Sequence, residues 1–171
     1  MKRRGSAALH AMLPTNTEEP SPPQALRMAR VLWSGLLGGQ AVFAALVVWL
    51  VVAGQVPRTP NAYPMLMYVA LGALAVLTPL AYFLRNQIYK ASWREHAVSP
   101  RGYVGGNLIL MVLLEAAGFI AFMAVLVIGA LMPTVLIGAA ALAVQFVNFP
   151  TGTPMRPRGP AIGERQDTHE P

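Results

Sequence analysis

Glu115 is the residue of this sequence best placed to carry chemistry, because it lies inside a long apolar run. The run extends from Leu108 to Ala130, LILMVLLEAAGFIAFMAVLVIGA, and Glu115 is its only charged residue. No other apolar run of the chain contains an acid. A carboxylate at membrane depth is costly and usually marks a functional site. Burial disfavours the charged form, so we expect Glu115 to be protonated at neutral pH.

Two glutamines are candidate partners for this acid. At 1.5 Å per residue, Glu115 lies roughly 13 Å and Gln40 roughly 15 Å from the same side of the membrane. We therefore expect an amide–carboxyl hydrogen bond between Glu115 and Gln40, with the shallower Gln145 as the second choice. The three residues form a candidate ion-binding set. In the structural alternative, Glu115 only fixes the register of two helices, through a bond that contributes about 1–2 kcal/mol or less.

The composition indicates that these residues stand on membrane-spanning helices. The 171 residues are 55% hydrophobic and 12% charged, whereas a soluble domain carries about 25% charged residues. No charge occurs between Arg30 and Arg58 or between Arg58 and Arg85, and Glu115 is alone between Arg101 and Arg156. A helix needs about 20 apolar residues to cross the hydrocarbon, and the last of these windows is long enough for two crossings.

The sequence therefore predicts an all-α membrane protein with four transmembrane helices in two antiparallel hairpins. The transmembrane domain comprises residues 24–149, and the predicted spans are about 27–53, 64–84, 105–130 and 133–149. Ser21-Pro22-Pro23-Gln24 resembles a helix start with a capping box. The tails, residues 1–23 and 150–171, are Pro-rich and polar and are expected to be disordered. Residues 1–23 lack the pattern of a cleavable signal peptide.

Several local features refine this prediction. Pro79 is expected to bend the second span. The loop from Arg85 to Arg101 is expected to extend that span as an interfacial helix up to Ser99-Pro100. Small residues at helical spacing let helices approach closely in lipid, which predicts a packing stripe on the first span and another on the fourth. The stripes consist of Ser34, Gly38, Ala41 and Ala45 on the first span, and Gly138 and Ala141 on the fourth.

The basic residues predict the orientation. Twelve Lys and Arg lie in the two tails, the root of the first span and the loop after the second span, whereas Arg58 stands alone on the opposite side. Cytoplasmic loops are enriched in Lys and Arg, so both termini are expected in the cytoplasm and the protein in the inner (cytoplasmic) membrane, as a multi-pass protein. The net charge of +6 is not gathered into a patch with aromatics, so nucleic acid is not an expected partner.

The residue types argue against an enzyme. Intramembrane hydrolysis needs a nucleophile with a base, paired aspartates or a metal cluster. The chain has no cysteine, its one aspartate, Asp167, lies in a tail, and its three histidines (His10, His96 and His169) lie outside the spans. We expect no catalytic residue, no metal and no cofactor.

The second hairpin is similar to the proteolipid subunit c of rotary ATPases. Leu84-Arg85-Asn86-Gln87 stands where that family has a polar, Arg-containing cytoplasmic loop, and Glu115-Ala116-Ala117-Gly118-Phe119 resembles the region around its ion-binding acid. The resemblance covers about residues 65–131. It implies that Glu115 is a carboxylate that binds a proton or a cation, in a homo-oligomer.

The direction of the Glu115 side chain separates two packing arrangements. On a helical wheel, Ala117, Ala121 and Ala124 lie nearly opposite Glu115. If these alanines form the seam inside the protein, the acid points outward, which favours a homo-oligomer or a membrane partner subunit that covers it. If the alanines face a neighbour, the acid faces the bundle. The function we expect is a non-enzymatic accessory or interaction subunit with a structural Glu115; the alternative is proton or cation handling through Glu115.

Overall fold

The computed structural model describes residues 19–157, except 60, 62 and 95. The predictions for residues 1–18 and 158–171 lie outside this part of the chain. The described elements are four helices, a two-stranded antiparallel hairpin and one 3-10 turn. They are α1 (Pro22–Val52), α2 (Tyr63–Ala91), β1 (Trp93–Arg94), β2 (Ala97–Val98), α3 (Pro100–Ile128), α4 (Thr134–Val147) and η2 (Thr153–Met155).

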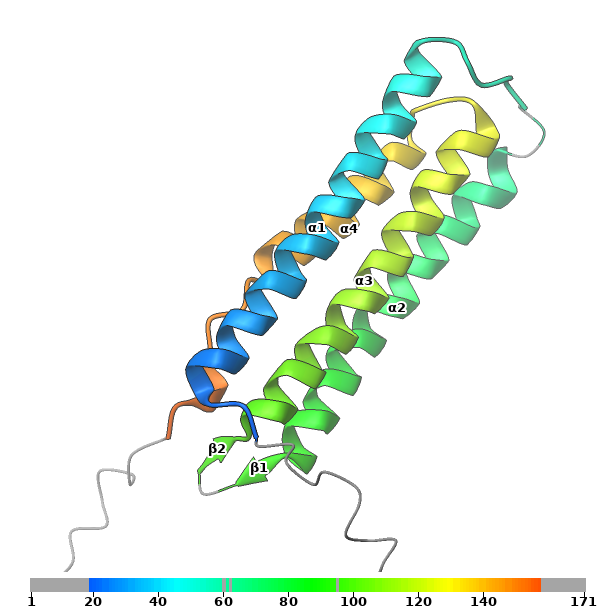
Figure 1. The fold of residues 1–171 in the computed structure, drawn as a ribbon. Helices are drawn as coiled ribbons and strands as arrows, with labels where there is room; N and C mark the ends of the chain where they lie inside the picture. Colours follow the sequence, from blue (N-terminus) through cyan, green and yellow to red (C-terminus); the bar gives the residue numbers. More distant parts are fainter. Residues whose placement is uncertain (1–18, 60, 62, 95, 158–171) are drawn as a thin grey trace, which may run out of the picture.

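Helix α3 is the centre of the bundle. It packs against α1, α2 and α4, which contact one another far less (Figure 1). Fourteen of its residues are buried, whereas α2 has two buried residues and α1 has five. The exposed surfaces of α1 and α2 are rich in large apolar side chains such as Val42, Trp49 and Tyr68. Such a surface is unsuited to water and is the expected outside of a bundle in lipid.

The prediction of long apolar helices is confirmed for three of the helices. Within the described residues, α1, α2 and α3 are each long and apolar enough to cross a bilayer. Helix α4 has 14 residues, which gives about 21 Å of helix, less than the roughly 30 Å hydrocarbon thickness. Three of the four predicted spans thus have the length and composition of membrane helices, and the fourth, α4, is a shorter apolar helix whose crossing is not confirmed.

The helix starts follow the predicted local chemistry. The backbone N–H of Ser21 donates to Oε1 of Gln24 at 3.0 Å, and Pro22 occupies the first position of α1. Ser99 caps α3 through its side chain instead, because its Oγ accepts from the backbone N–H of Gly102 at 3.2 Å. These bonds satisfy amide groups that have no partner within the first helical turn.

The loop after α2 differs from the prediction. An interfacial helix was expected to continue to Pro100, but α2 ends at Ala91 and the chain forms the β1–β2 hairpin. Trp93 pairs with Val98 across this hairpin, and His96 has a positive φ of 70° in its turn. The hairpin places Val98 in the core beside α3, which an exposed interfacial helix would not do.

Residues 150–157 also differ from the prediction, which assigned them to a disordered tail. The segment folds back onto the bundle: Met155 packs in one buried cluster with Ala25, Ala29 and Tyr103. The backbone N–H of Gly152 donates to the Tyr103 hydroxyl at 2.9 Å. The packed domain therefore extends at least to the 3-10 turn η2.

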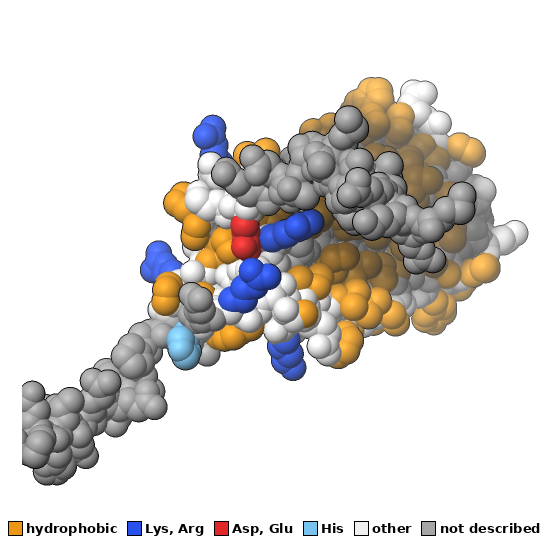
Figure 2. Space-filling view, turned by 60° about the horizontal axis from the view of Figure 1, so that its bottom comes forward, with side chains coloured by type: hydrophobic (Ala, Val, Ile, Leu, Met, Phe, Trp, Pro, Cys, Tyr) orange, Lys and Arg blue, Asp and Glu red, His pale blue; other side chains and the backbone are white. Residues whose placement is uncertain are grey.

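Most charged side chains of the described residues lie at one end of the bundle. This end, called the basic end, holds the start of α1, the end of α2, the hairpin, the start of α3 and η2. Figure 2 shows it from below, with Lys and Arg side chains around its rim and hydrophobic side chains along the walls behind. Its basic residues are Arg27, Arg30, Arg85, Lys90, Arg94, Arg101 and Arg156; Arg58 lies in the loop at the opposite end.

Candidate functional site

Glu115 is the sixteenth of the 29 residues of α3 and therefore lies near the middle of the helix. Its side chain is partly exposed on the outside of the bundle. Phe119, one turn further on, packs against Phe43 of α1 with 4.9 Å between ring centroids. Residues four apart share a helix face, so Glu115 lies along the border between α3 and α1. Its carboxyl group has no hydrogen bond or ion pair with any residue that the structure describes.

Gln40 reaches Glu115, as its depth predicted, but it meets a different atom. Its side-chain Nε2 donates to the backbone carbonyl oxygen of Glu115 at 3.5 Å, and not to the carboxyl group. The side chain is fully buried, and Oε1 has no partner among the described residues. It lies over Gly118, where any side chain would collide with the amide. Gln40 therefore fills the seam between α1 and α3 and leaves the acid unpaired.

Gln145 does not join the other two residues in a single site. It is fully buried, and neither atom of its amide group has a partner in the described chain. Its backbone carbonyl accepts from Nε1 of Trp33 at 3.0 Å, which ties α4 to α1. The described residues contain no group of three His, Cys, Asp or Glu side chains that could hold a metal ion.

The alanine stripe of α3 resolves the direction of the acid. Ala121 and Ala124 are buried in a cluster with Ala70 of α2, and Ala117 is fully buried as well. The stripe opposite Glu115 is thus an internal seam, largely with α2. Of the two arrangements that the sequence allows, the structure has the one in which Glu115 points outward.

The two predicted packing stripes behave differently. Gly138 and Ala141 of α4 are buried against α3, where the Phe122 ring fills the space over Gly138. Ser34, Gly38, Ala41 and Ala45 of α1 are all exposed, and no atom of another element lies within 4 Å of the Cβ position at Gly38. The α1 stripe therefore makes no contact with the other helices that the structure describes. A helical wheel finds small residues that share a face, but it does not show which face meets a neighbour.

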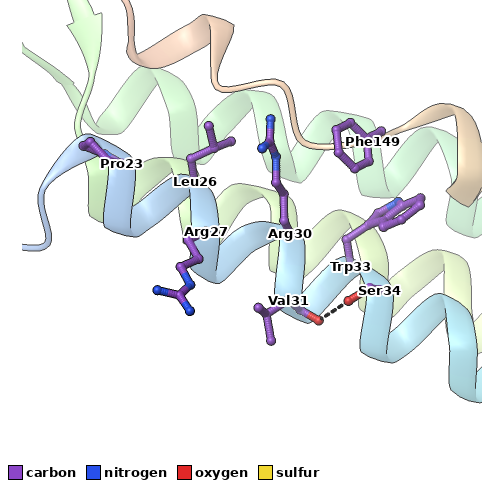
Figure 3. A pocket seen from close by; sticks show the side chains of 8 residues that line it. All are labelled: Pro23, Leu26, Arg27, Arg30, Val31, Trp33, Ser34 and Phe149. Atoms are coloured by element: carbon purple, nitrogen blue, oxygen red, sulfur yellow. Dashed lines mark hydrogen bonds between the residues drawn. The ribbon is translucent and has the colours of Figure 1, made fainter.

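A groove runs along α1 at the basic end. It has a volume of about 420 Å³ and a mostly apolar wall that includes Leu26, Trp33 and Phe149. Figure 3 shows Arg30 extending toward Phe149 and Arg27 pointing away from it. The Arg30 guanidinium carbon lies 5.2 Å from the Phe149 ring centroid, and its Nε donates to the Pro150 carbonyl at 3.3 Å. These contacts hold the segment after α4 against α1.

A second arginine organises a polar cluster that the sequence did not reveal. Arg85 of α2 donates from Nη1 to Oδ1 of Asn148 at 3.3 Å, and Asn148 donates to the hydroxyl of Tyr82. Beside them, Nδ2 of Asn107 donates to the Tyr89 hydroxyl at 2.8 Å. The cluster joins α2, α3 and the end of α4. A signal that could have indicated it is the set of polar residues at the ends of the predicted spans, which includes Asn107.

Comparisons with protein-family models, with curated proteins and with solved structures find no match to this chain. The fold and the site geometry define the chain as a small α-helical protein with membrane-length helices and an outward-facing acid.

Proposed function

We propose that this protein is a small, non-enzymatic membrane subunit that works by binding another polypeptide through the face that carries Glu115. The observation that supports this proposal is the position of the acid. Glu115 is near the middle of the central helix, partly exposed and unpaired within the described chain. An ionisable group at the centre of a membrane helix costs about 2.5–3.5 kcal/mol on insertion scales, and a polar group from a second chain would lower that cost.

A cross-linking experiment tests this proposal. A photoreactive benzophenone side chain replaces Glu115 or, as the matched control, Val76, which is a largely exposed residue of α2. After irradiation of native membranes, position 115 should give a discrete protein adduct, and position 76 should give mainly lipid adducts. An adduct of twice the chain mass identifies a second copy, and another mass identifies a different partner. Lipid adducts alone at both positions would overturn the proposal.

The second candidate function is proton or cation handling through Glu115 in a proteolipid-like homo-oligomer. The same carboxyl group favours it, because an acid without a partner among the described residues is available to an ion. A hydrophobic carbodiimide, which reacts with protonated carboxyl groups reached from the bilayer, should label wild-type protein and leave Glu115→Gln unlabelled. A polypeptide partner that covers the acid would block labelling in the membrane and restore it in detergent. This difference separates the two functions.

We also propose that α4 completes a fourth crossing, so that both termini face the cytoplasm of an inner membrane. Seven described Lys and Arg at the basic end against Arg58 at the other support this orientation. The chain lacks cysteine, so single substitutions Arg58→Cys, Met132→Cys and Arg156→Cys can be labelled with an impermeant maleimide. The first two should react in intact cells, and the third only after permeabilisation. Reaction of Met132→Cys and Arg156→Cys from the same side would contradict the crossing by α4.

A further inference from the structure

A polar cavity lies at the basic end, between α2, α3 and the segment that follows α4. Its volume is about 190 Å³. The side chains that line it include Arg85 and Tyr89 from α2, Tyr103 and Asn107 from α3, and Asn148. None of the described lining residues is acidic. The cavity is separate from Glu115, which lies two to three turns further along α3.

The guanidinium group of Arg85 is held in this cavity with most of its donors unused. It lies over two aromatic rings, 4.9 Å from the Tyr82 centroid and 5.9 Å from the Tyr89 centroid. Of its N–H groups, Nη1 donates to Asn148, while Nε is fully buried and has no partner in the part of the chain that the structure describes. The one ion pair among the described residues, between Arg94 and Glu19, does not involve Arg85.

A partly buried cation without a counter-charge is unfavourable, because desolvation is not offset by a partner. An arginine carries five N–H donors in a planar fork that matches the oxygens of phosphate. The two tyrosine rings lie close to the guanidinium carbon, and the N–H groups without a described partner remain available to a ligand. The position therefore favours an anion with several acceptor oxygens.

The two phenols of the cavity add further donors. The Tyr89 hydroxyl accepts from Asn107, and the Tyr103 hydroxyl accepts from the backbone N–H of Gly152. The side chain of Asn107 also interacts with the Tyr103 hydroxyl. In the bonds found among the described residues both hydroxyl oxygens act as acceptors, so their protons remain available to a ligand. A cavity lined by a guanidinium group and two available phenol protons favours an acceptor-rich anion and disfavours a cation.

We propose that this cavity binds a phosphate group, with Arg85 as the charged contact and the hydroxyls of Tyr89 and Tyr103 as additional donors. The basic end is also where the apolar wall of the bundle stops, so the phosphate can be that of a phospholipid headgroup or a free phosphate ion. The two sources share the same recognition chemistry. This inference does not depend on the role of Glu115.

The test uses the full chain, purified in a neutral detergent. Native mass spectrometry measures binding of phosphatidylglycerol, with diacylglycerol of the same acyl chains as the phosphate-free control. In parallel, the melting temperature is measured in sodium phosphate and in sodium chloride of equal ionic strength. Binding of phosphatidylglycerol without a phosphate-specific shift identifies the lipid as the source. A phosphate-specific shift without lipid selectivity identifies the free ion.

Three variants make the test specific. Arg85→Gln should weaken phosphate binding about tenfold or more, since hydrogen bonds to charged groups are the strong ones. Tyr89→Phe keeps the ring beside Arg85 and should weaken binding roughly two- to tenfold, as expected for one neutral hydrogen bond. The control is Arg27→Gln, which removes the same charge from an exposed side chain at the same end and should leave binding unchanged.

Two results would overturn the proposal. One is the absence of phosphate-dependent binding by the wild-type chain in both measurements. The other is an equal loss in Arg27→Gln and Arg85→Gln, which would mean that only the general charge of the basic end attracts the anion. If Arg85→Gln fails to fold by circular dichroism, Tyr89→Phe alone decides: wild-type affinity in that variant would contradict the assigned site.

Discussion

Adding one methyl group at Gly138 should destabilise the protein, whereas the same change at Gly38 should not. Both glycines belong to stripes that the sequence predicts for helix packing, and the structure separates them. A Cβ at Gly138 would lie 2.7 Å from Cε1 and Cζ of Phe122 and 3.0 Å from its Cδ1. A Cβ at Gly38 would meet nothing within 4 Å.

The magnitude follows from this crowding. Carbon atoms pack best at about 3.5 Å or more, so the Phe122 ring would have to retreat by roughly 0.8 Å. The ring is buried in a cluster with Val47 and Val125 and has little room to move. Overpacking of this kind costs about 1–3 kcal/mol. Gly38→Ala, on an open surface, should change the free energy of unfolding by less than about 0.5 kcal/mol.

The assay is reversible unfolding in mixed detergent micelles, followed by far-UV circular dichroism. Phe122→Leu provides a control, because removing the ring should relieve the clash: combined with Gly138→Ala, it should show a favourable coupling of about 0.5 kcal/mol or more. Equal effects of the two alanine substitutions, or a larger effect at Gly38, would refute the assignment of the internal seam. A change of oligomeric state in Gly38→Ala alone would instead identify the α1 stripe as a contact with another chain.

Three further predictions follow from hydrogen bonds. Gln40→Met should be neutral or stabilising in the same unfolding assay, since it removes a buried amide with one long hydrogen bond and one unpaired atom. A decrease of more than about 1 kcal/mol in the free energy of unfolding would indicate that Gln40 pairs with the Glu115 carboxyl group. Glu115→Gln should leave the unfolding free energy within about 0.5 kcal/mol, because its carboxyl group has no described partner, and a larger loss would reveal an internal bond. Tyr103→Phe should leave the backbone N–H of Gly152 without an acceptor and lower the free energy of unfolding by about 1–3 kcal/mol. Faster hydrogen exchange at Gly152 would detect this loss, and an unchanged exchange rate would contradict the docking of this segment.

The sequence was sufficient to predict the helices, and the reason is the solvent. In hydrocarbon every backbone polar group must be satisfied within the chain, so long apolar runs form helices, and charges mark their ends. The start of α1 at Pro22 was also readable, because Ser21 and Gln24 form a local pattern. The hairpin after Ala91 could not be predicted in this way. Its side chains fit a helical wheel equally well, and only the packing of Val98 against the core distinguishes the two structures.

The sites were harder to predict than the spans. Equal depth correctly brought Gln40 to Glu115, but depth fixes the height of a residue on its helix and not the direction of its side chain. Gln40 therefore meets the backbone carbonyl, and the acid faces away. The cavity around Arg85 combines residues from α2, α3 and the segment after α4, up to 69 positions apart (Arg85 to Pro154). No spacing rule connects such residues, so only the folded bundle reveals them.

The arrangement of polar groups in the bundle bears on what Glu115 is for. Two buried amides, Gln40 and Gln145, retain unpaired atoms inside the protein, so partners for a carboxyl group are present in the interior. An acid that fixed the helix register would be expected to point toward these amides, because a hydrogen bond between the carboxyl group and an amide would satisfy an unpaired atom of each. Glu115 instead stands on the outer surface, opposite the alanine seam that a rotation of α3 would destroy. The tight packing of Ala121 and Ala124 against α2 therefore keeps the acid outside, where a second polypeptide or an ion can reach it.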